Sequence, residues 1–310
     1  MTGPTAHTGP AAQAAQPAHT AQPATAAPAA KRRRALTRLR TLGGSPLQRT
    51  CLLLLVLFVL VALLAPWLAP QDPTFGRLGD TLLGPSADHW LGTDQGGHDT
   101  FSALISGTRT SLAGPLAVVL FSTLLGTAVG LFTAWRGGWI DTVTVRVLDV
   151  VFAFPALLLA ILAVALFGKG MTAPVLAMAI AYMPYTARLV RGLAVQEKAR
   201  PYIAAYQVQG HSALFVTVRR MLPNIAPTLL AQSTVNFGYA LLDLAALSFL
   251  GLGVQPPTPD WGAMINQGQA AVLQGQPLSA IAPAVAVVLV VVAFNVVGEN
   301  LGDRLAGRDS

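Results

Sequence analysis

Side chains able to carry out chemistry are few in this 310-residue chain, and most lie outside its long apolar runs. All five histidines lie outside those runs, at His7, His19, His89, His98 and His211. Nucleophilic catalysis needs a nucleophile and a base within reach of each other, so an enzyme that works inside a membrane is disfavoured. His89 and His98 are nine residues apart with no cluster of further ligands. We therefore expect ordinary loop residues there, with no catalytic residue and no metal site.

Nucleotide hydrolysis by this chain is disfavoured as well. The sequence contains no GxxxxGK[ST] segment, whose backbone would cradle the phosphates of a bound nucleotide. Lys169 in the segment GKG lacks the earlier glycine that such a loop requires. The single cysteine, Cys51, excludes an intrachain disulfide and an all-cysteine metal site. The chain is predicted to be no enzyme and to bind no cofactor.

One acidic residue, Asp243, lies well inside a long apolar run. A charged group within a membrane is costly and by default marks a solute pathway or a buried partner. Two interpretations stay open for Asp243. It forms a structural hydrogen bond to a neighbouring helix, or it takes part in a pathway.

The composition points to lipid as the main solvent of the chain. Hydrophobic residues make up 53% of it, charged residues only 11%, and the mean hydropathy is +0.57, whereas soluble domains have about 25% charged residues. Six apolar runs approach or exceed the ~20 residues that a helical crossing needs. Because the runs are continuous rather than alternating, they predict helices rather than a barrel. The predicted spans are 51–69, 111–134, 147–168, 172–192, 225–250 and 278–298.

The predicted fold is therefore all-α, a polytopic membrane protein with six transmembrane helices. Residues 1–45 are predicted to be a disordered Ala/Pro-rich tail with a basic juxtamembrane segment, and 46–70 the first transmembrane helix. Residues 71–110 form an extracytoplasmic segment, and 111–306 a core of five helices. Within that core, the GxxxG pattern of GTAVG (126–130) would let a second helix approach closely.

The distribution of basic residues predicts the orientation. With a cytoplasmic N-terminus, 17 of the 20 Lys and Arg residues fall in inside segments, as the positive-inside rule requires. Both termini are then cytoplasmic, and segments 70–110 and 251–277 lie outside. The basic excess is explained by topology, so a nucleic-acid partner is disfavoured. The lipid bilayer is the expected surrounding.

The longest predicted cytoplasmic loop contains PYIAAYQVQGHSALFVTVRRMLPN (201–224). Residues 202–208 predict a short helix, which Gly210 would end in a left-handed conformation. A second helical segment then leads through Pro223 into the fifth span. A helix this short is not stable alone. Two interpretations stay open: an amphipathic helix on lipid, or a helix seated in the groove of a partner protein.

This loop resembles the EAA loop of bacterial ABC importer permeases. Ala204, Ala205 and Tyr206 occupy the Glu-Ala-Ala places, Gly210 the glycine, and Leu222-Pro223 the Leu-Pro pair. The motif's acid is replaced by Ala204, which puts one charge contact with the ATPase in doubt. The resemblance implies an ATPase-coupling loop at 195–224, with coupling residues Tyr202, Ile203, Ala204, Ala205, Tyr206, Gly210, Ser212, Leu214, Arg219, Leu222, Pro223 and Asn224.

Four further stretches are similar to the C-type second permease of the dipeptide, oligopeptide and nickel importers. They are HWLGTDQGGHDTFSALISGTRTSL (89–112), LDVVFAFPALLLAI (148–161), LSFLGLGVQPPTPDWGAM (247–264) and AFNVVGENLGDRL (293–305). Together they cover most of 85–306 in the family's order. The resemblance implies the type I permease fold in a bacterial inner membrane. The prolines and the amphipathic Trp261 of QPPTPDWGAM suit a shaped loop at the headgroup level outside, which predicts that Asp260 and Trp261 line the outer mouth or contact a binding protein.

The same resemblance implies the partners and the solute. The partners are a second homologous permease, two cytoplasmic ATPases that hold ATP and Mg, and an extracytoplasmic solute-binding protein. The expected solutes are di- or oligopeptides, and relatives carry nickel or metal chelates, glutathione or opines. An ion-coupled secondary transporter is a remote alternative, because among the predicted spans only Asp243 is a candidate for ion coupling.

Overall fold

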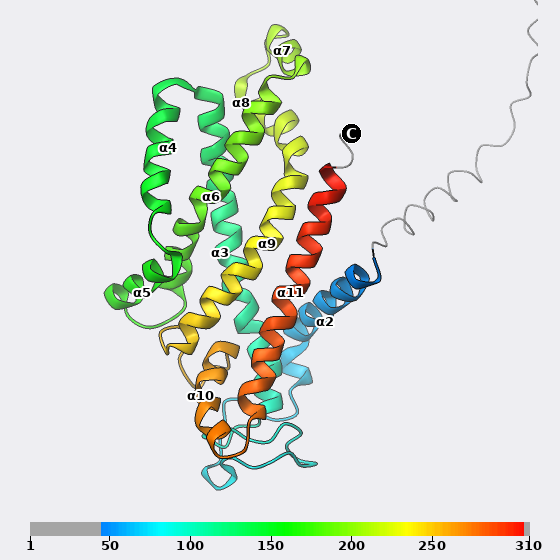
Figure 1. Ribbon diagram of the computed structural model, residues 1–310, viewed down its shortest axis with the longest axis vertical. Coiled ribbons are helices and arrows are strands. Elements are labelled where there is room, and N and C mark those ends of the chain that lie inside the picture. Colours follow the sequence, from blue (N-terminus) through cyan, green and yellow to red (C-terminus); the bar gives the residue numbers. More distant parts are fainter. Residues whose placement is uncertain (1–44, 307–310) are drawn as a thin grey trace, which may run out of the picture. The chain divides into compact units, whose positions relative to one another are not determined.

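The computed structural model describes residues 45–306, and these form one helical unit (Figure 1). No strand occurs within this range, only an isolated bridge between Thr93 and Asp99. The all-α prediction is confirmed for the described part of the chain. The predicted N-terminal tail lies outside the described residues except for Ser45, whose side chain caps the first helix.

Long helices supply most of the unit. They are α2 (Pro46–Leu68), α3 (Thr100–Arg136), α6 (Thr172–Lys198), α9 (Leu222–Phe249) and α11 (Leu278–Ala306). Shorter elements join them: η1 (Leu78–Asp80), α4 (Gly138–Phe152), α5 (Ala156–Phe167), α7 (Pro201–Val208), α8 (Ala213–Val216), the π-helical turn η2 (Thr217–Met221) and α10 (Trp261–Leu273).

The number of membrane spans agrees only in part with the six predicted. Four of the described helices are long and apolar enough to cross a membrane, namely α2, α3, α6 and α11, and α4 with α5 is a fifth if the bent pair is one span. The 28-residue α9 is long enough but is not among them. Its polar residues lower its hydropathy, so six spans remain compatible with the structure without being confirmed.

The predicted continuous third span, 147–168, is wrong in its geometry. The structure divides it into α4 and α5, which meet at an angle of 77°. Pro155 lies at the break, preceding the first residue of α5. Proline lacks a backbone N–H and disfavours helical geometry in the residue before it, so Phe154 is poorly suited to continue α4.

The predicted limits of two other spans are too narrow. Helix α3 begins at Thr100, eleven residues before the predicted start of its span, and α11 runs to Ala306 rather than 298. The first turns of α3 contain Ser102, Thr108 and Ser111, which are buried against other parts of the chain. Polar residues lower the hydropathy of a segment, so a search for apolar runs misses these turns even though their side chains are buried.

Helices α3 and α6 pack closely at the GTAVG segment, as its GxxxG pattern predicted. A methyl group added at Gly126 would lie 2.7 Å from Cβ of Thr186, and one added at Gly130 would lie 2.6 Å from the carbonyl oxygen of Ala187. Only glycine allows backbones to come this close. The core cluster joins residues of α3, α5, α6, α9, α10 and α11, including Val118, Met178 and Leu244.

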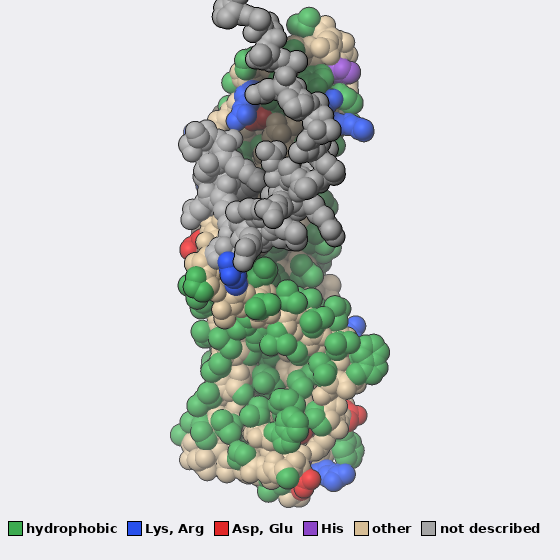
Figure 2. Space-filling model, turned by 90° about the vertical axis from the view of Figure 1, so that its right-hand side faces the viewer, with side chains coloured by type: hydrophobic (Ala, Val, Ile, Leu, Met, Phe, Trp, Pro, Cys, Tyr) green, Lys and Arg blue, Asp and Glu red, His purple; other side chains and the backbone are tan. Residues whose placement is uncertain are grey.

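The predicted inner and outer segments lie at opposite ends of the bundle. Figure 1 shows α7 and α8 at one end, and the segment before α3 together with α10 at the other. Between the ends, α2 exposes large apolar side chains such as Leu53, Leu63 and Trp67. Figure 2 shows a face of the unit on which hydrophobic side chains dominate, as contact with lipid requires.

Replacing Gly130 with alanine tests the α3–α6 contact. The new methyl group collides with the backbone of α6, and such overpacking costs about 1–3 kcal/mol. We expect Gly130→Ala to lower the temperature at which the detergent-solubilised protein unfolds, measured by size-exclusion chromatography after heating. Gly192→Ala is the matched control, because nothing lies within 4 Å of that position. Equal unfolding temperatures for the two variants would contradict the close packing.

Candidate functional site

The short helix predicted at 202–208 is present as α7, with Pro201 in its first turn. Gly210 has φ +81°, as predicted, and ends the helix in the left-handed conformation. The N–H of Gly210 donates to the carbonyl of Gln207 at 3.0 Å, and the N–H of His211 donates to that of Tyr206 at 3.1 Å. This is the Schellman arrangement. It closes the last turn of α7 and redirects the chain.

After this corner the chain returns to the bundle without a break. Ser212 caps α8, because its hydroxyl accepts from the N–H of Phe215 at 3.3 Å. The wide turn η2 then passes directly into α9, with Pro223 in the first turn of that helix. Proline is tolerated there because the first N–H groups of a helix need no partner within it. Arg219, Pro223 and Asn224 are exposed along this return.

The α7–α8 corner has an inner and an outer face. On the inner face, Ile203 is 1% exposed and packs in a cluster with Val216 and Met221, against which Tyr202, Tyr206 and Leu222 also pack. On the outer face, Ala204 and Ala205 are exposed, Leu214 is 73% exposed and Val208 89%. The outer face thus carries exposed apolar side chains beside the exposed Gln207, Gln209 and His211, and it has no acid at Ala204. It is uncovered among the described residues.

A buried acid that the sequence did not single out supports this corner. Glu197, near the end of α6, is only 5% exposed. Its Oε1 accepts hydrogen bonds from the hydroxyl of Tyr202 at 2.5 Å and from Nδ2 of Asn224 at 2.8 Å. Its Oε2 lies 3.0 Å from Nε of Arg200. One carboxylate thus joins α6, α7 and α9, and we call these four residues the Glu197 brace.

Lys198, the residue after Glu197, attaches the end of α6 to that of α3. Its Nζ donates hydrogen bonds to the carbonyls of Ala134 and Trp135 at 3.2 and 2.9 Å. Burial and the hydrogen bond to Glu197 raise the pKa of Tyr202 to about 12. The phenol therefore remains protonated, and able to donate to Glu197, throughout the physiological pH range.

A row of rings extends from the inner face of the corner to its surface, because Tyr206 and Phe215 are partly buried and His211 is exposed. The rings of His211 and Phe215 stack at 4.7 Å, and Tyr206 lies 5.4 Å from His211. The guanidinium of Arg220 lies over Tyr206 at 4.8 Å, a favourable cation–π geometry. His211 is thus part of a surface stack.

Asp243 forms the hydrogen bond to a neighbouring helix that one of its two interpretations requires, and its part in a pathway stays a prediction. Its Oδ2 accepts a hydrogen bond of 2.9 Å from the hydroxyl of Tyr182, which joins α9 to α6. It also lines a pocket of about 520 Å³, which we call the α6–α9 pocket. The other lining residues are Phe152, Phe154, Pro155, Ala156, Ala181, Tyr182, Tyr185, Gln232, Asn236 and Tyr239.

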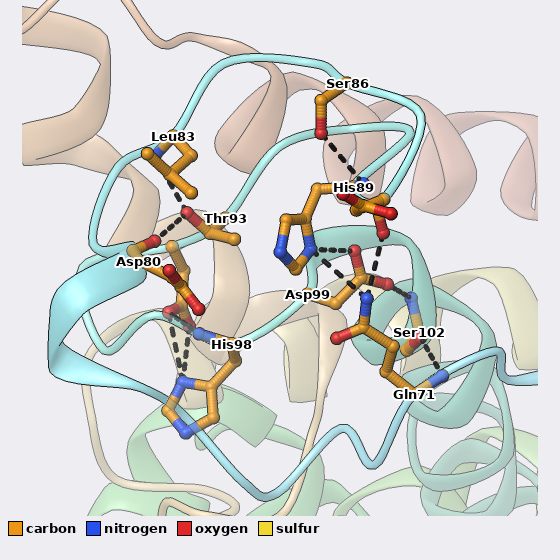
Figure 3. Close-up of polar contacts among 11 residues, drawn as sticks. Gln71, Asp80, Leu83, Ser86, His89, Thr93, His98, Asp99 and Ser102 are labelled. Atoms are coloured by element: carbon orange, nitrogen blue, oxygen red, sulfur yellow. Dashed lines mark hydrogen bonds and ion pairs between the residues drawn. The ribbon is translucent and has the colours of Figure 1, made fainter.

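At the opposite end, the segment before α3 folds around its own aspartates (Figure 3). Nδ1 of His89 lies 3.0 Å from Oδ1 of Asp99, which also caps α3 by accepting from the N–H of Ser102. His98 is likewise 3.0 Å from Asp94. The two histidines bind separate aspartates, and no group of three His, Cys, Asp or Glu side chains gathers among the described residues.

Asp260 and Trp261 lie at this end but are buried, at 2% and 0% exposure. Asp260 caps α10, because its Oδ1 accepts a hydrogen bond from the N–H of Ala263. Its Oδ2 accepts a second hydrogen bond from the hydroxyl of Ser111, with an O–O distance of 2.9 Å. The indole N–H of Trp261 donates to the carbonyl of Leu104. A fully buried side chain has no surface for a binding protein, which runs against the predicted contact. The two residues instead fix α10 onto α3.

The predicted site residues thus fall in three separate places. The twelve residues of the coupling loop gather at one end, Asp243 lies on α9 in the pocket, and Asp260 with Trp261 lies at the other end. Sequence reasoning missed Glu197 because no spacing rule links an acid at a helix end to Tyr202 and Asn224. The available signal was an acid next to Lys198 immediately before a short helix.

Comparison with known proteins identifies the family. The model for the binding-protein-dependent transport system inner membrane component matches residues 126–308, and that for the N-terminal transmembrane domain of oligopeptide transport permease C matches residues 38–85. The glutathione transport system permease protein GsiD of Pectobacterium atrosepticum is 40% identical over 257 residues, 82% of this chain and 84% of that protein. GsiD of Escherichia coli O1:K1 is also 40% identical, over 83% of this chain and 84% of its own length.

A solved structure supports the fold. A chain of the MetNI methionine ABC transporter, in an inward-facing conformation, is similar with a TM-score of 0.51. The likeness covers 66% of this chain and 97% of that one at 17% identity, so it bears on architecture alone. The chain belongs to the binding-protein-dependent transport system inner membrane components and is a multi-pass permease subunit of an ABC importer, not an enzyme.

Proposed function

We propose that this permease conducts short peptides, glutathione among them, across a bacterial inner membrane with both termini in the cytoplasm. The match to the oligopeptide permease C domain and the 40% identity to glutathione permeases support this solute class. The excess of basic residues in the segments predicted to face inward supports the orientation.

The α7–α8 corner is the proposed docking point for an ATPase subunit. Its exposed apolar face, with Val208 and Leu214 outermost, would seat in a groove of that partner. The single observation that carries this role is that the exposed helix is rigidly mounted: Ile203 is buried beneath it and the Glu197 brace holds its first turn. A loosely attached loop would absorb a displacement instead of transmitting it.

Membership of the family supports the remaining partners that we propose. A second homologous permease would complete the pathway, an extracytoplasmic binding protein would deliver the solute, and two cytoplasmic ATPases would bind ATP and Mg. Movement of an ATPase would displace α7, and the Glu197 brace would transmit this displacement to α6 and α9. These two helices carry Tyr182 and Asp243, respectively. Because Ala204 replaces the acid of the EAA motif, the docking contact would lack the charge that this acid supplies.

Uptake of labelled solutes by a strain lacking this gene tests the solute class. We expect loss of uptake of labelled glutathione and of di- and tripeptides, with restoration by the intact gene. Uptake of a nickel chelate and of an opine serves as the comparison. A defect confined to either of these would overturn the peptide assignment.

Gly210→Val tests the corner. Nothing lies within 4 Å of Gly210, so the only penalty is the positive φ, which a β-branched residue adopts poorly. We expect at least a several-fold loss of solute uptake, with normal insertion in the membrane. Gly210→Asn is the matched control, since asparagine tolerates this conformation and should retain most uptake. Full uptake and normal ATPase association in Gly210→Val would count against the coupling role.

Glu197→Ala tests the brace. Tyr202, Asn224 and Arg200 then lose their shared acceptor, so α7 is less firmly tied to α6 and α9. We expect ATP hydrolysis by the assembled importer to continue while solute transported per ATP falls several-fold, measured in proteoliposomes. Glu197→Gln, which keeps an acceptor oxygen, should recover part of this ratio. An unchanged ratio in Glu197→Ala would exclude the brace from coupling.

A further inference from the structure

The α6–α9 pocket presents polar groups along one face of α9. Gln232, Asn236, Tyr239 and Asp243 are spaced four, three and four residues apart and all line the pocket, as the helical repeat requires for residues on one face. Asp243 is the only ionisable carboxyl group among the lining residues. This face of α9 therefore carries three neutral polar side chains and a single carboxylate.

That carboxylate has no cationic partner among residues 45–306. Its one hydrogen bond there comes from the neutral hydroxyl of Tyr182. Neither arginine of α6 pairs with it. Arg188 lies 3.2 Å from Asp149 and over the ring of Phe152, and Arg191 lies 2.5 Å from Asp141. Acids within a membrane bundle are normally paired or functional, so the pocket has room and charge for a cation that this part of the chain does not supply.

The walls of the pocket favour an organic ammonium group. Phe154, Tyr182, Tyr185 and Tyr239 line it, and aromatic faces attract ammonium ions. The ring of Phe152 also lines it but already lies under the guanidinium of Arg188, at 4.5 Å. A divalent metal ion would instead require several oxygen or nitrogen ligands from the protein. No group of three His, Cys, Asp or Glu side chains exists among the described residues, so a metal is the poorer fit.

We propose that the α6–α9 pocket is a subsite of the translocation pathway that receives a primary ammonium group of the solute, with Asp243 as its counter-ion. This subsite rests on the proposed peptide function, because the amino terminus of a peptide supplies such a group. Tyr182 orients the carboxylate through its hydroxyl, and the aromatic rings offer their faces to the ammonium. Each solute molecule pauses there during its passage.

Charge-selective labelling of a cysteine beside Asp243 tests the subsite in the whole importer, with its partner subunits present. Tyr239, which is 55% exposed, is changed to cysteine after the native Cys51 is replaced by alanine. A trimethylammonium and a sulfonate methanethiosulfonate reagent are compared, each normalised to its rate with a free thiol. We expect the cationic reagent to react about tenfold faster, as a local negative field predicts. Trialanine should slow the reaction, whereas Nα-acetyl-trialanine should not.

Two variants separate the charge from the surrounding contacts. Asp243→Asn keeps the size of the side chain and should bring the normalised rates within about twofold of each other. Tyr182→Phe removes only the hydrogen bond and should keep the cationic preference. Equal rates with Asp243 intact, or equal protection by both peptides, would overturn the subsite. Failure of Asp243→Asn to assemble with the second permease would show that Asp243 contacts a subunit instead.

The labelling result is independent of the solute assignment. If the importer takes up no peptide but the cationic preference is present, the peptide function fails and an ammonium site remains for another amine. If peptides are taken up and the preference is absent, the subsite alone fails.

Discussion

The close packing of α3 against α6 is the contact on which the rest of the structure depends. Gly126 and Gly130 allow the backbone of α3 to meet Thr186 and Ala187 of α6 with no side chain between them. Helix α6 carries Tyr182, which binds Asp243 in the pocket, and its last turn carries Glu197, which supports α7. A shift of α6 relative to α3 would therefore displace both the α6–α9 pocket and the corner that we propose for ATPase docking.

The Glu197 brace shows how a small exposed helix is made stiff without a large core. Eight residues of isolated helix are unstable in water, yet α7 is held by one buried isoleucine and by a carboxylate with three donors. Burial strengthens these hydrogen bonds, because little water reaches Glu197 to compete with its protein donors. The same design leaves Val208 and Leu214 free to face another protein.

The two ends of the bundle solve different problems. At the end that carries α7 and α8, apolar side chains remain uncovered around a rigid corner. At the opposite end, aspartates are used internally: Asp94 and Asp99 bind histidines, and Asp260 caps α10. The acidic character of the segment before α3 is therefore partly structural. Exposed acids such as Asp72 and Asp88 remain at its surface.

The sequence by itself determined the helical class, the short helix at 202–208, the left-handed glycine at Gly210 and the glycine contact of α3, because hydropathy, turn chemistry and GxxxG spacing are local signals. Only the tertiary structure decided the bend at Pro155, the early start of α3, the burial of Trp261 and the role of Glu197. Those features depend on which distant groups meet: Ser111 with Asp260, or Asn224 with Glu197. No pattern of spacing along one chain records such pairings, since each is fixed by how the helices pack.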